Sequence, residues 1–101
     1  MQEHVPRQEV EVGFVTHYWS HLGVAGVHLE APLDVGDHIH VLGHTSDFEQ
    51  DVDSIELWHH EVGHADHGDD VGIRVAQHAR EHDKVYKAVD LAEMAASESD
   101  L

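Results

Sequence analysis

The chain has 101 residues, no cysteine and a formal net charge of -16, which comes from 21 acidic and only 5 basic side chains. This length favours a single domain, and no apolar stretch reaches the roughly 20 residues that cross a bilayer. The absence of cysteine excludes disulfides and thiolate sites, and with no secretory signal in 1–6 it predicts a cytoplasmic protein.

The acidic composition predicts a salt-adapted protein. Like charges at this density repel one another across a folded surface, and molar salt shortens the Debye length to about 3 Å, which screens the repulsion. We therefore hypothesise a halophilic host, with an ordinary acidic protein or a protein that has a basic partner as alternatives. The 13 histidines are interpreted mainly as solvated polar surface.

Alternating apolar and polar side chains predict a series of short strands and no α/β pattern. In segment 9–18 the alternation places Val10 and Val12 on one face, and the loop 17–21 is expected to join this strand to the next as a hairpin. Pro and Gly in segment 32–37 predict a reversal of the chain. The expected strands are 9–18, 22–30, 38–42, one from about residue 48 onward, 71–76 and 84–89.

The alternation changes phase once within the strand that begins near Phe48. The apolar side chains up to Val52 share one phase, whereas Ile55 and Leu57 have the opposite one, so we predict a β-bulge between Val52 and Ile55. The predicted domain organisation is a flexible N-terminus at 1–7, an all-β domain at 8–90 and a flexible or short helical tail at 91–101.

Five motifs in chain order resemble one known β-domain. They are VGFVTHY at 12–18, SHLGVA at 20–25, VGDHIHVLG at 35–43, DVGIRV at 70–75 and DKVY at 83–86. Together they resemble the second domain of translation GTPases of the elongation factor Tu type, and most of all the stand-alone translation elongation factor-like proteins. The resemblance implies a six-stranded Greek-key closed barrel. It does not imply a GTPase, because the chain lacks a P-loop motif.

The segment 60–64, HEVGH, matches the H-E-x-x-H motif of zinc peptidases. That chemistry needs a helix, which places both imidazoles on one face beside the glutamate base. A glycine within the motif and a polar turn-like segment after it predict an extended or coiled backbone instead, so we do not expect a metalloprotease. Adventitious binding of Zn²⁺ or Ni²⁺ is better supported than peptidase chemistry, because imidazole suits these ions. The imidazoles would be those of His59, His60, His64 and His67.

The aromatic loop is the candidate binding site. Tyr18, Trp19 and His21 could anchor a partner, although one or both aromatic rings could instead cap the end of the core, and Trp58 raises the same question. We assign no catalytic, cofactor-binding or metal-binding residue and predict a protein that is not an enzyme. With so few basic residues, binding to DNA is not expected.

Three functions remain open at this point. The resemblance implies a non-enzymatic binding module in protein biosynthesis that contacts RNA or a ribosome-associated protein, and no membrane. A protein-interaction module supporting a partner enzyme such as a collagenase-like peptidase is the alternative, because a similar barrel is appended to some of those peptidases. A histidine-based metal-binding protein is the third.

Overall fold

The computed structural model describes residues 7–90, and the whole of this part is built from strands and turns. The prediction of an all-β domain is therefore confirmed, and no helix that could cross a membrane is found in the described part. The predictions of a flexible N-terminus at 1–7 and of a tail at 91–101 fall almost entirely outside the described residues and stay predictions. The strands are β1 (Arg7–Trp19), β2 (Val24–Leu29), β3 (Leu33–Asp34), β4 (His38–Leu42), β5 (Asp47–Asp51), β6 (Ile55–Leu57), β7 (His60–Val62), β8 (His64–Ala65), β9 (Asp70–Arg74) and β10 (Lys84–Asp90).

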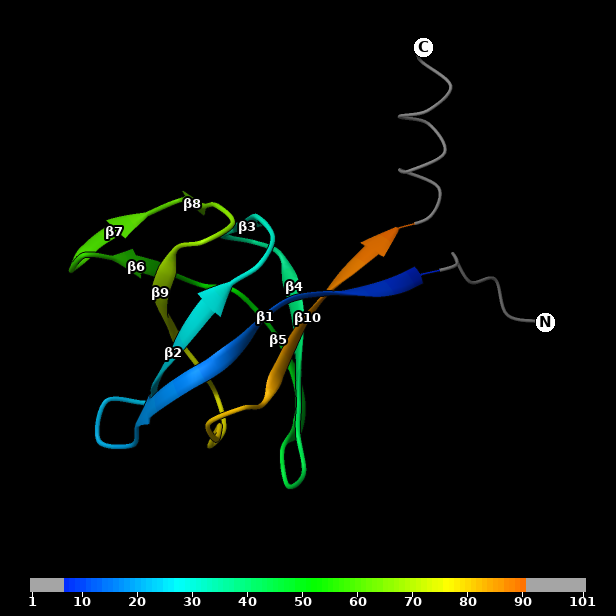
Figure 1. The fold of residues 1–101 in the computed structure, drawn as a ribbon, viewed down its shortest axis with the longest axis horizontal. Helices are drawn as coiled ribbons and strands as arrows, with labels where there is room; N and C mark the ends of the chain where they lie inside the picture. Colours follow the sequence, from blue (N-terminus) through cyan, green and yellow to red (C-terminus); the bar gives the residue numbers. More distant parts are fainter. Residues whose placement is uncertain (1–6, 91–101) are drawn as a thin grey trace, which may run out of the picture.

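Eight of these strands form one strongly curved antiparallel sheet in the order β5-β4-β10-β1-β2-β9-β6-β7. The long strand β1 runs through its middle and pairs with β10 on one side and β2 on the other (Figure 1). Strands β3 and β8 form a separate two-stranded ribbon.

The expectation of a six-stranded closed barrel is wrong, because the sheet has eight strands and is not closed. Within residues 7–90, the two edges of the sheet are β5, which pairs with β4, and β7, which pairs with β6. Alternation along the sequence tells which face a side chain occupies. It does not tell which strands become neighbours, and closure depends on that neighbour order.

Two bulges bend β1, and the predicted bulge lies elsewhere. The register of β1 shifts between Glu11 and Gly13 against β10, and between Val15 and His17 against β2. Such shifts increase local twist and help a sheet to curl. The predicted bulge between Val52 and Ile55 is wrong, because the chain there leaves β5 and crosses to β6, which pairs with β9 and β7.

The core fills the concave side of the sheet. Side chains that alternate along the strands pack there with at most a few per cent of their surface exposed, and β4 and β9 follow the period of two closely. The buried aliphatic side chains come largely from the alternating apolar positions that predicted the strands. Its fully buried members are Leu29, Leu33, Ile39, Ile55, Ile73, Val12, Val15, Val27, Val41, Val52 and Val85.

The strand at 38–42 was predicted with its observed bounds, and the first hairpin was predicted with too long a loop. Strand β1 continues to Trp19, so the turn comprises only residues 20–23, and the amide of Gly23 donates to the carbonyl of Trp19 at 2.9 Å.

A second tight turn joins β6 to β7 through Trp58 and His59, both with positive φ. Trp58 is 83% exposed at its tip.

Candidate functional site

The predicted binding residues lie at the end of β1 and in the turn after it. Tyr18 is half-buried, packs against the core and stacks on His78 with ring centroids 4.4 Å apart. Trp19 is more exposed, and its ring lies over Gly26 and beside His17. His21 is exposed in the turn. Tyr18 thus fits the capping interpretation, while partner binding by this group stays a prediction.

An open hollow of about 440 Å³ lies beside Tyr18. Its walls come from the end of β1 and from the segment before β10, and they combine aromatic, imidazole, guanidinium and carboxylate groups. Such a mixed, shallow surface suits contact with a polar protein segment better than enclosure of a small molecule. The lining residues are His17, Tyr18, Ser20, His78, Ala79, Arg80 and Glu81.

The HEVGH segment has the extended backbone that the sequence analysis predicted. His60, Glu61 and Val62 form β7, and His64 begins β8 after a bend at Gly63. His64 lies between two carboxylates, with Nδ1 at 2.6 Å from Asp34 and Nε2 at 2.7 Å from Asp66. Without a helix the two imidazoles do not share one face in the way a zinc peptidase requires.

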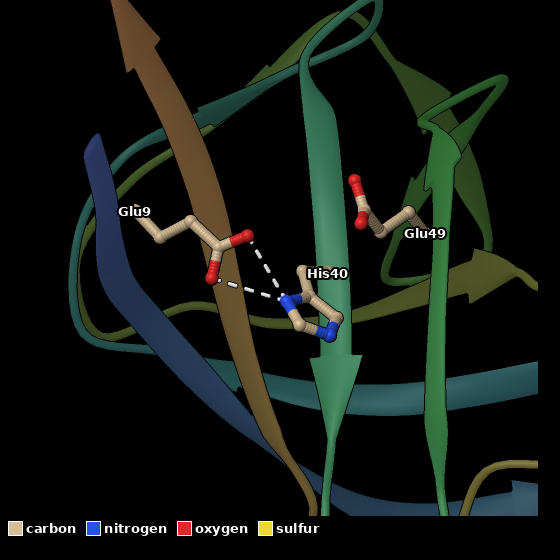
Figure 2. Close-up of side chains that lie close together, drawn as sticks. All are labelled: Glu9, His40 and Glu49. Atoms are coloured by element: carbon tan, nitrogen blue, oxygen red, sulfur yellow. Dashed lines mark hydrogen bonds and ion pairs between the residues drawn. The ribbon is translucent and has the colours of Figure 1, made fainter. Parts of the chain in front are cut away.

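A cluster centred on His40 crosses four strands on the outer face of the sheet. His40 of β4 lies opposite Glu49 of the edge strand β5. Its Nδ1 lies 3.0 Å from both carboxylate oxygens of Glu9 on β1, and its Nε2 lies 2.6 Å from Asp47. Figure 2 shows Glu9 and Glu49 approaching this imidazole from opposite sides. One ligand atom from each of Glu9, His40 and Glu49 lies within 4.8 Å of the other two.

Glu9 reaches the imidazole across an intervening strand. In the register of β1 and β10, Glu9 lies opposite Ala88, and His40 lies opposite Tyr86 of the same strand. The methyl group of Ala88 is short, so the Glu9 side chain can extend over β10 toward β4. The imidazole of His40 is correspondingly sheltered, with only 16% of its side chain exposed.

Both histidines of β4 bridge pairs of carboxylates, on β5 alone for His38 and on β5 and β1 for His40. Hydrogen bonds to Asp47 and Glu9 raise the pKa of His40 above its usual value, and bonds to Asp51 and Glu49 raise the pKa of His38 in the same way. Partial burial opposes both shifts but is the smaller effect. The cationic form of each imidazole is therefore stabilised by carboxylates that would otherwise repel one another.

The sequence analysis missed this cluster. The signal was present locally, because HIH at 38–40 and DFEQD at 47–51 have matching periods of two on either side of a short turn. Antiparallel pairing of these segments brings imidazoles and carboxylates together. The contribution of Glu9 could not be found in this way, because Glu9 is 31 residues from His40 in the sequence. The position of Glu9 beside His40 depends on the pairing of β1 with β10.

No family model matches this chain. A curated protease of the archaeon Methanocaldococcus jannaschii, described as uncharacterised, is 32% identical over 80 residues, which cover 78% of this chain. The match spans 20% of that protease, so the chain corresponds to about a fifth of its length.

Two solved structures share the fold. One is the C-terminal domain of a putative U32 peptidase from Geobacillus thermoleovorans, with a TM-score of 0.71, 23% identity and coverage of 75% of this chain and 89% of that domain. The selenomethionine variant of the same domain gives a TM-score of 0.72 at 22% identity, with coverage of 75% and 96%. At this identity the likeness establishes the fold alone.

These findings overturn the resemblance to translation elongation factors. The relative found by sequence is a protease, and the similar structures come from a U32 peptidase. The expected role in protein biosynthesis is therefore wrong. Motifs as short as VGD suit turns and strands in general, and a likeness of fold does not establish function.

Proposed function

We propose that this chain is a non-catalytic binding domain that acts together with a peptidase of the U32 type. The observation that carries the proposal is the match to a protease over most of this chain but only a fifth of the protease. A matched segment of about 80 residues has the size of one accessory domain. The fold shared with a U32 peptidase C-terminal domain supports the same assignment.

The lack of catalytic geometry in residues 7–90 supports a binding role. Near Ser20, the ring of His78 packs at a tilt against Tyr18 and the ring of His17 packs at a tilt against Trp19, so both imidazoles are engaged by aromatic neighbours. The HEVGH segment is extended, as described above. A general base and a nucleophile need mutual hydrogen-bonding geometry, and no such pair lies in the hollow.

The end of the sheet with the hollow is the proposed contact surface. Trp19 offers an exposed aromatic ring, and Arg80 and Glu81 offer charged groups at its rim. Aromatic and arginine side chains are the residue types that most often dominate the binding energy of protein interfaces. The large negative charge of the chain further favours a partner with a basic contact surface.

A binding experiment with two matched tryptophan variants tests this function. The chain and the U32-type peptidase encoded in the same genome are mixed in molar KCl and analysed by size-exclusion chromatography with light scattering. We expect a stoichiometric complex, no peptide hydrolysis by the chain alone, and a dissociation constant raised about tenfold or more by Trp19→Ala. Trp58→Ala, at a different exposed turn, should leave binding unchanged.

Two results would contradict the proposal. Failure of the two proteins to associate at concentrations near 50 μM, taken as roughly the weak limit of specific complexes, removes the proposed partner. Peptide hydrolysis by the chain alone, abolished by a point substitution, removes the non-catalytic role. Equal weakening by Trp19→Ala and Trp58→Ala would retain the partner but reject the proposed contact surface.

A further inference from the structure

We infer that Glu9, His40 and Glu49 form a binding site for a divalent transition metal ion, with zinc as the best-suited probe. This inference differs from the sequence-based expectation of no metal site, and it is independent of the proposed association with a peptidase. The three side chains come from β1, β4 and β5, so their proximity is a product of the folded sheet.

The donor set has the right composition for such an ion. Zinc in proteins is held by imidazole nitrogen and carboxylate oxygen, commonly with three protein ligands and water in the fourth position. The sites of hard ions such as Mg²⁺ are built from oxygen alone, so a sheltered imidazole at the centre of the cluster selects against them. The three ligand atoms supply one nitrogen and two oxygens.

The distances allow coordination after a small closure. Ligand atoms no more than 4.8 Å apart can share a centre that is at most about 2.8 Å from each of them. Zinc requires about 2.0 to 2.2 Å, so each ligand must move by at most about 0.7 Å. The side chains of Glu9 and Glu49 are 43% and 54% exposed. Glu49 Oε1 also lies 2.8 Å from His38 Nε2, so closure of the site has to keep or exchange that hydrogen bond.

Asp47 accepts a hydrogen bond from His40, as a carboxylate next to a metal-bound histidine commonly does. Such a histidine binds the ion through one ring nitrogen and donates the other N–H to a carboxylate, which fixes the tautomer and the ring orientation. In His40, Nε2 lies 2.6 Å from Asp47, while Nδ1 faces Glu9. The hydrogen bond to Asp47 therefore orients Nδ1 as the ligand atom.

His64, another histidine between two carboxylates, provides a comparison for this site. His64 contacts two carboxylates, those of Asp34 and Asp66, but this group does not form a set of three ligands within the same distance in the part of the chain that the structure describes. His64 is thus a matched control, since it has a similar hydrogen-bonded environment without the third ligand.

Metal binding at this site would tie three strands together across β10. Glu49 belongs to the edge strand β5, and Glu9 belongs to the central strand β1. A ligand that binds the folded state and not the unfolded one raises stability with its concentration. Zinc should therefore raise the unfolding temperature of the chain in a saturable manner.

Calorimetric titration of the metal-free chain with ZnCl₂ alone tests the inference. We expect one site whose dissociation constant rises about tenfold or more in Glu9→Gln, His40→Gln and Glu49→Gln, and also in the supporting variant Asp47→Asn. His64→Gln should bind zinc as the unmodified chain does, and a large excess of Mg²⁺ should not displace the ion. The zinc-dependent rise in unfolding temperature should follow the same order of variants.

Each other outcome overturns the inference. Absence of zinc binding, full binding by His40→Gln, or a loss that appears in His64→Gln and not in His40→Gln would show that no site exists at His40. Displacement by Mg²⁺ would show a diffuse carboxylate effect. If His40→Gln fails to fold, the exposed substitutions Glu9→Gln and Glu49→Gln decide the question, because neither removes a buried group.

Discussion

Single histidines in this protein act as bridges between carboxylates. His64 shows this most simply, because its two ring nitrogens lie close to Asp34 and Asp66 on either side. The hydrogen bonds to these carboxylates raise its pKa above the usual value of 6.5, with Asp34 as the larger cause. The raised pKa favours the cationic form of this imidazole in a chain that has only 5 lysine and arginine side chains.

We predict that the pKa of His64, measured by NMR titration of its imidazole, lies above 6.5 and falls in Asp34→Asn. Glu81→Gln removes one negative charge from the other end of the sheet, where it faces His17, and should leave this pKa nearly unchanged. An equal fall in both variants would indicate general electrostatics in place of a specific bridge.

The direction of the effect on stability follows from linkage. Because the pKa is raised in the folded state, the contribution of His64 is fully present below the unfolded pKa of about 6.5 and is lost as the pH rises through the folded value. The bridge is well exposed to solvent, so the effect on the whole chain is small. The titration of the imidazole itself is the better measurement.

At the scale of the strands, Gly13 is a position where the sheet has no room for a side chain. It sits at a bulge of β1, pairs with both neighbouring strands, and a Cβ built there would overlap the carbonyl oxygen of His28. That obstacle is backbone, so it cannot rotate away. Gly63 offers the contrast, because a Cβ added to it meets no atom within 4 Å.

Gly13→Ala should therefore lower the free energy of unfolding by about 1 to 3 kcal/mol, the usual cost of overpacking. Gly63→Ala should be neutral, or stabilising by up to about 1 kcal/mol through the unfolded state. Urea unfolding of both variants at one fixed KCl concentration measures the difference. Similar unfolding midpoints for the two variants would show that the bulge can relax.

Local strands could be predicted from the sequence, but their partners could not. The segment 38–42 was found with its observed bounds because Ile39 and Val41 alternate with polar residues over a length typical of strands. The change of phase after Val52 was also visible, yet a bulge and a crossing to another part of the sheet produce the same pattern. Only pairing of β6 with β9 distinguishes them, and that contact is between segments distant in sequence.

The residues of the candidate sites were likewise only partly predictable from the sequence. Tyr18 and Trp19 stood out as aromatic residues near a turn, and the His40 cluster was overlooked because its members are spread over β1, β4 and β5. Hydrogen-bond register within one hairpin can be estimated from periodicity. A side chain that reaches across an intervening strand requires the whole sheet.

For the molecule as a whole, the net charge of -16 remains the dominant electrostatic fact. We predict that the unfolding temperature of the chain rises from low to molar KCl, because the added ions screen repulsion among exposed carboxylates. A neutral osmolyte at equal osmolality should stabilise the chain less. The measurement is thermal unfolding followed by circular dichroism, and an unfolding temperature independent of KCl would contradict the halophilic interpretation.

The same charge has a consequence for the open sheet. An edge strand has unpaired backbone N–H and C=O groups that can pair with a strand of another molecule. Such pairing is the first step of amyloid-like aggregation. Here every second residue of β5 is acidic, at Asp47, Glu49 and Asp51, and two copies meeting along this strand would bring these carboxylates face to face. Pairing of two copies along the edge strand β5 is therefore penalised by repulsion between the carboxylates of that strand.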